Sequence, residues 1–129
     1  MIVSLHVALG GLTGAGLRSR ALALLAGPVL HVACDRVPHE DIPSRRFEIG
    51  SGLACLALLA ARRGPLDAAV LGAAASSAPD LEHVVPRLRA HGQKLFHRRA
   101  QHGGGLPADV QLLVAGAILG ALLGAPRSG

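Results

Sequence analysis

The chain has 129 residues, a length that suits one domain with one hydrophobic core. Half of the residues are hydrophobic, the mean hydropathy is +0.44, and 16% are charged, against about 25% in soluble domains; these values favour a membrane protein over a soluble one. The net charge of +5 predicts anionic partners, but the scarcity of aromatic residues (2%) argues against nucleic acid and favours membrane lipids with anionic head groups.

Five apolar runs follow one another along the chain, at residues 1–17, 21–34, 47–61, 66–78 and 106–125. None of them alternates with a period of two, so we predict an all-α fold, a membrane-embedded bundle of about four to five short helices. The whole chain, 1–129, is expected to form one helical membrane domain, with a polar and basic segment at about 79–105. Most runs are shorter than the roughly 17–25 residues of a full membrane crossing, and the last comes closest. Gly27 and Pro28 are expected to kink the second helix.

Small residues recur at a spacing of four in three of these runs, which lets helix backbones approach closely in membranes. A GC-rich genome would also scatter glycine and alanine through the chain, although it would not explain the long charge-free runs. The triple repeat in the last helix is the strongest instance, and its face is a candidate for homo-oligomer contacts. The three sets are Gly10/Gly14, Gly72/Ser76 and Gly116/Gly120/Gly124.

The segment HVACDRVPHED, residues 31–41, places metal-binding residue types at the end of an apolar helix. His31 and Asp35 are four residues apart and share a helix face. His39 follows Pro38, where the helix should already have ended, and could fold back toward them. Together they could supply three ligands to a divalent ion. A His–Asp hydrogen bond at the helix end, with a solvated His39, is the equally weighted alternative.

Two further clusters lie in the polar segment. In PDLEH, Asp80 and His83 are three residues apart, and N-terminal capping of a helix by Asp80 is the simpler reading. In FHRRAQH, His97 and His102 flank two arginines, and a solvated basic loop is the simpler reading. His6 stands in an uncharged helix, where an ionisable group at membrane depth needs a partner. If the domain is a membrane bundle, these clusters should converge, and a metal is a common reason for convergence.

These motifs resemble a known family. PDLEH followed by HRRAQH resembles the paired P-D-[LI]-D-H and H-R-x-x-T-H motifs of small bacterial inner-membrane proteins identified as membrane-bound metal-dependent hydrolases, and LHVALGG is similar to their opening H-x-x-x-G. HVACDRVPHED resembles the H-x-x-x-D-x-x-P-H segment of related integral membrane proteins and, more distantly, the ligand run of zinc-dependent phospholipase C and the P1-type nucleases. The resemblance implies ligands at Asp80, His83, His97 and His102, with His6, His31, Asp35 and His39 as further candidates. Gln101 and Gly103 stand where the hydrolases have Thr and Ser.

The sequence therefore predicts an integral protein of the bacterial inner membrane that holds a divalent metal, most simply Zn²⁺, and hydrolyses a phosphoester or ester of a membrane-proximal substrate. Asp35 or Asp80 would orient the attacking water or act as the base, and Arg98 or Arg99 would hold a phosphate. The alternative is a non-enzymatic integral membrane protein whose His/Asp clusters are structural or bind a partner. The missing hydroxyl, with Gln101 and Gly103 in place of Thr and Ser, and the short chain favour that alternative.

Overall fold

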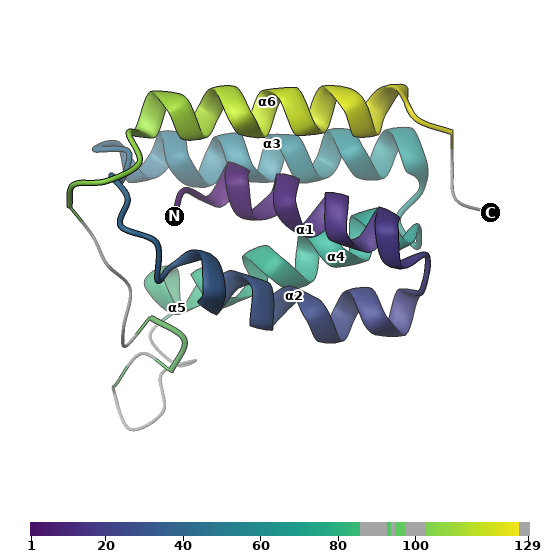
Figure 1. The fold of residues 1–129 in the computed structure, drawn as a ribbon, viewed down its shortest axis with the longest axis horizontal. Helices are drawn as coiled ribbons and strands as arrows, with labels where there is room; N and C mark the ends of the chain where they lie inside the picture. The colour runs from purple at the N-terminus through teal and green to yellow at the C-terminus, as the bar shows by residue number, and fades with distance from the viewer. Residues whose placement is uncertain (86–92, 94, 98–102, 127–129) are drawn as a thin grey trace.

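The computed structural model describes residues 1–85, 93, 95–97 and 103–126 (Figure 1). Within these residues there is no β-strand, which confirms the predicted all-α class. Five helices of ten or more residues coincide with the five apolar runs. The elements are α1 (Val3–Leu17), α2 (Arg20–Cys34), α3 (Arg45–Arg63), α4 (Ala68–Ser77), the 3₁₀ turn η1 (Ala78–Asp80), α5 (Leu81–Val84) and α6 (Ala108–Gly124).

The polar residues between the runs set several of these boundaries. Ser19, Ser44 and Asp67 each precede a helix and accept a hydrogen bond from a backbone N–H of its first turn, as N-caps do. α2 continues through Gly27 and Pro28 as one helix. In the part of the chain that the structure describes, no helix combines the length and the apolar composition needed to cross a membrane.

α1 lies in the centre of the bundle and contacts each of the other four long helices (Figure 1). α3 and α6 run side by side along one flank of α1, and α2 and α4 pack together on the other. α1, α3 and α6 begin at the same end of the bundle at which α2 and α4 finish. This arrangement brings His31, Asp80 and His97, one residue from each of the three predicted clusters, to one end of the bundle.

Close approach of α1 to α4 depends on the predicted small residues. A Cβ atom on Gly10 would overlap the backbone of Gly72 and the side chain of Ser76, and one on Gly14 would overlap the backbone of Ala68. The prediction that these spacings mark helix contacts is thus confirmed for α1 and α4.

The small-residue repeat of α6 behaves differently. A Cβ atom on any of its three glycines would meet nothing within 4 Å among the described residues. The strip formed by Gly116, Gly120 and Gly124 therefore packs no other described element of the same chain, and its use in a homo-oligomer stays a prediction.

Two buried polar side chains join α6 to the rest of the bundle. Arg63, at the end of α3, donates to Asp67 over 3.1 Å and to the carbonyl of Leu122 over 3.1 Å. At the opposite end of α6, Gln111 is fully buried, accepts from the N–H of Ile2 and donates to the carbonyl of Glu40. Each satisfies backbone or carboxylate groups that burial would otherwise leave unpaired.

Candidate metal centre

The last turn of α2 carries the first part of the site. His31 and Asp35 lie on one face, as predicted, with His31 Nε2 3.4 Å from Asp35 Oδ2. α2 ends at Cys34, and Asp35 continues the helical backbone as its C-cap. Both side chains are buried, at 0% and 3% exposure. A buried carboxylate needs partners, and the neighbouring elements supply them.

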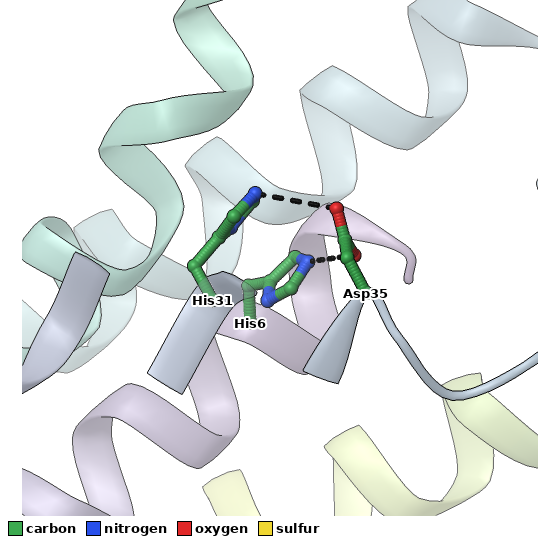
Figure 2. Close-up of side chains that lie close together, drawn as sticks. All are labelled: His6, His31 and Asp35. Atoms are coloured by element: carbon green, nitrogen blue, oxygen red, sulfur yellow. Dashed lines mark hydrogen bonds and ion pairs between the residues drawn. The ribbon is translucent and has the colours of Figure 1, made fainter. Parts of the chain in front are cut away.

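α1 contributes His6, which is also fully buried. Its ring stacks on that of His31, with centroids 4.0 Å apart, and its Nε2 lies 3.1 Å from Asp35 Oδ1 (Figure 2). His6 thus has the partner that its place in an uncharged helix requires. The three side chains from two helices converge on one point at the end of the bundle.

The polar segment after α4 brings the other two clusters to the same point. Asp80 lies at the junction of η1 and α5, and its side chain makes no capping hydrogen bond to α5. Its Oδ1 lies instead 3.3 Å from His97 Nε2 and 3.9 Å from His31 Nε2. The simpler readings of these two clusters, a helix cap and a solvated loop, therefore do not describe Asp80 and His97. His97 is 9% exposed.

The protonation of the two central rings follows from their outer contacts. His31 Nδ1 donates to the carbonyl oxygen of Ser76 over 2.8 Å, because a carbonyl can only accept. His97 Nδ1 donates in the same way to Glu82 Oε2 over 3.2 Å. In the neutral rings the Nε2 atoms then carry lone pairs, and these atoms face each other 3.0 Å apart. A proton or a cation is needed between them.

The surroundings of this pair fit a divalent metal. His31, His97, Asp35 and Asp80 offer two nitrogen and two oxygen donors, with five of the separations between 3.0 and 3.9 Å. A metal with N and O ligands at about 2.0–2.2 Å sets neighbouring tetrahedral ligand atoms about 3.3–3.6 Å apart. Donor atoms of His31, Asp80 and His97, and likewise of His6, His31 and Asp35, all lie within 4.8 Å of one another.

The hydrogen bonds that orient the two rings are of a kind that is common at metal sites. Metal-binding histidines commonly donate their second N–H to a carboxylate or a carbonyl, which fixes the ring and its tautomer. Glu82 and the Ser76 carbonyl do this for His97 and His31. Glu82 is itself held by the backbone N–H groups of Leu95 and Phe96.

The electrostatics agree with this assignment. Burial alone would raise the pKa of Asp35, but hydrogen bonds from His31, His6 and the terminal amine hold it well below its usual range. Burial alone would lower the pKa of His97, but hydrogen bonds to Asp80 and Glu82 raise it. The Asp35 carboxylate is therefore charged at neutral pH, and it favours a cation beside it.

The remaining predicted residues lie around this centre. His39 is fully buried and folded back, as predicted; its Nδ1 donates to the Val37 carbonyl and its Nε2 contacts the Met1 amine, which in turn lies 2.6 Å from Asp35 Oδ1. His83 packs edge-on against His97, with ring centroids 4.1 Å apart, outside both donor groups. His102, Arg98 and Arg99 lie outside the described residues.

A cavity of about 100 Å³ opens beside the donors. Asp35, Asp80 and His97 line its inner wall, and Arg45 and Glu48, from the first turn of α3, line another part. Burial, together with Asp41 and Asp80, raises the pKa of Glu48. The cavity gives a small molecule access to the donor set.

Sequence reasoning missed three contributors to the site. Glu82 lies within PDLEH itself, between Asp80 and His83, but it is not part of the i, i+3 pair that these two residues form. Arg45 begins an apolar helix and gave no signal beyond its charge. Ser76 acts through its backbone carbonyl, which no side-chain pattern reveals. Comparison of the chain with protein-family models, curated proteins and solved structures gives no significant match.

Proposed function

We propose that this protein is a membrane-associated, metal-dependent hydrolase that uses a Zn²⁺ ion held by His31, His97, Asp35 and Asp80. One observation carries the proposal: two histidine Nε2 atoms, each oriented from behind by an acceptor, face each other 3.0 Å apart beside two buried or half-buried carboxylates. The resemblance of PDLEH and HRRAQH to the membrane-bound metal-dependent hydrolases supports the same chemistry.

Each residue has a role that suits hydrolysis. A divalent metal at this position would supply Lewis-acid polarisation of a phosphoryl or carbonyl oxygen. Both oxygens of Asp35 already have partners: Oδ1 contacts the imidazole of His6 and the Met1 amine, and Oδ2 contacts the imidazole of His31. Its role is therefore to keep these groups in place around the metal. Asp80 lines the cavity, and its Oδ2 is buried without a hydrogen-bond partner among the described residues. That oxygen is the candidate base that would take a proton from the attacking water.

Membrane association is supported by the outer faces of the helices. Large apolar side chains are exposed on α2, α3 and α6, including Leu25 at 71%, Val29 at 70%, Leu53 at 61% and Leu113 at 74%. Apolar surface spread over several helices is typical of contact with lipid or with a partner. The substrate would then be an ester or phosphoester at the membrane surface.

Metal analysis tests the proposal. The purified wild-type protein should contain close to one equivalent of Zn²⁺, and His31→Ala and His97→Ala should each lose it. His83→Ala is the matched control, because that ring lines the same cavity but lies outside both donor groups. Circular dichroism of each variant would verify that the helices persist.

Three outcomes would overturn all or part of the proposal. No metal in the wild-type protein, after purification and after addition of Zn²⁺, would leave a proton on His97 as the cation of the cluster and would favour the structural alternative. Equal metal content in wild type and His97→Ala would place the metal elsewhere. Stoichiometric metal with no hydrolysis of any phosphoester or carboxylic ester tested would refute the hydrolase assignment alone.

A further inference from the structure

An apolar groove adjoins the cavity of the metal centre. It has a volume of about 250 Å³ and shares Val3, Ile49 and Asp80 with that cavity. The two hollows therefore meet at Asp80, one of the proposed metal ligands. A molecule bound at the donors would therefore lie next to the groove.

Helical spacing explains why this groove is hollow and apolar. On one wall, Ala74, Ser77 and Ala78 are spaced i, i+3, i+4 and present small side chains along α4 and η1. On the facing wall, Leu53 and Leu56 follow the same spacing along α3 and supply apolar surface. Small residues on one side and long ones on the other leave a channel between the helices.

We infer that this groove holds the hydrocarbon chain of an ester substrate whose polar head lies at His31, His97, Asp35 and Asp80. The inference rests on the proposed function and specifies its substrate as a molecule with one apolar chain next to the scissile group. The volume equals roughly eight groups of the size of a water molecule, at about 30 Å³ each, which suits a chain of about that many methylenes.

The charges beside the donors indicate how the head is held. The residues that line the cavity of the metal centre include four carboxylates, of Asp35, Asp41, Glu48 and Asp80, against two cations, the guanidinium of Arg45 and the amine of Met1. A divalent metal would offset part of that negative charge. The site therefore suits a head that binds through one polarised oxygen and carries little negative charge of its own, with Arg45 beside it.

Chain-length dependence of binding tests the inference. Octanohydroxamate and acetohydroxamate share a metal-binding head and differ by six methylenes, and each buried methylene should strengthen binding about four-fold. The dissociation constant of each would be measured by isothermal titration calorimetry, with and without Zn²⁺. With Zn²⁺, we expect the octanoyl compound to bind at least about 100-fold more tightly.

Matched variants locate the gain. Ala74→Leu would fill the groove, whereas Ala54→Leu changes an exposed position of α3 outside it. Leu53→Asp would charge the rim at a side chain already 61% exposed, so folding should persist, and Leu58→Asp, at 57% exposure, is its control. The gain should fall below ten-fold in Ala74→Leu and Leu53→Asp and should persist in both controls, with acetohydroxamate unchanged in all four.

Three results would overturn the inference: no gain with chain length, a gain that survives both groove variants, or a gain lost equally in the controls. A changed oligomeric state in Ala74→Leu without any chain-length effect would assign the groove to a second copy of the chain and would also overturn it. Loss of Zn²⁺ binding is a separate failure. If the wild-type protein binds no metal but the Zn²⁺-free titrations still show a gain lost only in the groove variants, the groove stands and the hydrolase does not.

Discussion

Substitution of Glu82 distinguishes a metal site from a purely structural His/Asp cluster, because Glu82 supports one of the proposed metal ligands. Glu82 is 2% exposed, and its Oε2 lies 3.2 Å from His97 Nδ1, whereas the other ring nitrogen, Nε2, is the one that would bind the metal. Glu82→Gln keeps the shape but removes the charge that strengthens this hydrogen bond. Loss of such a supporting partner lowers metal affinity by about 10–100-fold, which corresponds to about 1.4–2.7 kcal/mol.

The assay is competition for Zn²⁺ between the protein and a chromophoric chelator. Glu40→Gln is the matched control, because it removes the same charge from an exposed position of the neighbouring loop. We expect its dissociation constant for Zn²⁺ to change less than three-fold. The reasoning is refuted if Glu82→Gln binds Zn²⁺ as tightly as Glu40→Gln does while both variants retain wild-type helicity.

Three further predictions concern stability. Arg63→Met should lower the free energy of unfolding, measured by chemical denaturation, by about 3–5 kcal/mol, because it leaves the buried Asp67 carboxylate without its ion pair. Arg62→Met changes an exposed position and should lower the same free energy by less than about 1 kcal/mol. Gly10→Ala should lower the free energy of unfolding by about 1–3 kcal/mol, and with it the melting temperature, because the new Cβ atom would overlap α4. Gly16 faces open space, so Gly16→Ala should leave the melting temperature unchanged. In EDTA, the contribution of His97 to stability should be complete below its ordinary pKa of 6.5 and should disappear as the pH rises through its raised folded value, so thermal melts of wild type and His97→Gln should converge at alkaline pH.

The pattern of apolar residues predicted the helices well because each long helix is built on a largely apolar run with polar residues at its boundaries. Ser19, Ser44 and Asp67 precede three of them as N-caps. The spacing of Gly10 and Gly14 also predicted a close helix contact, although it did not identify α4 as the partner of α1. The same pattern in α6 does not pack within the described chain, because a small residue permits a close approach but does not specify a partner.

The sequence predicted the parts of the site and the convergence of its clusters, but not the individual contacts between them. His31 and Asp35 share a face by helical geometry alone, so their pairing needed no tertiary information. The approach of His97 to His31 depends on the path of the chain after α4, which no local pattern fixes. Gln111 is a further contact that no local pattern reveals: it is fully buried near the start of α6 and accepts a hydrogen bond from the N–H of Ile2.

A proton and a divalent metal could each hold the four donors together, and the two respond oppositely to pH. Because the pKa of His97 is raised in the folded state, its proton stabilises the cluster at low pH, and this stabilisation disappears as the pH rises through that raised pKa. Metal binding requires the same nitrogen without its proton, so stabilisation by Zn²⁺ must grow as the pH rises. The increase in melting temperature on adding Zn²⁺ should therefore be small at pH 5.5 and larger at pH 7.5. A purely structural cluster would show no Zn²⁺-dependent increase at either pH, so the direction of this response identifies which cation the buried carboxylates are arranged to hold.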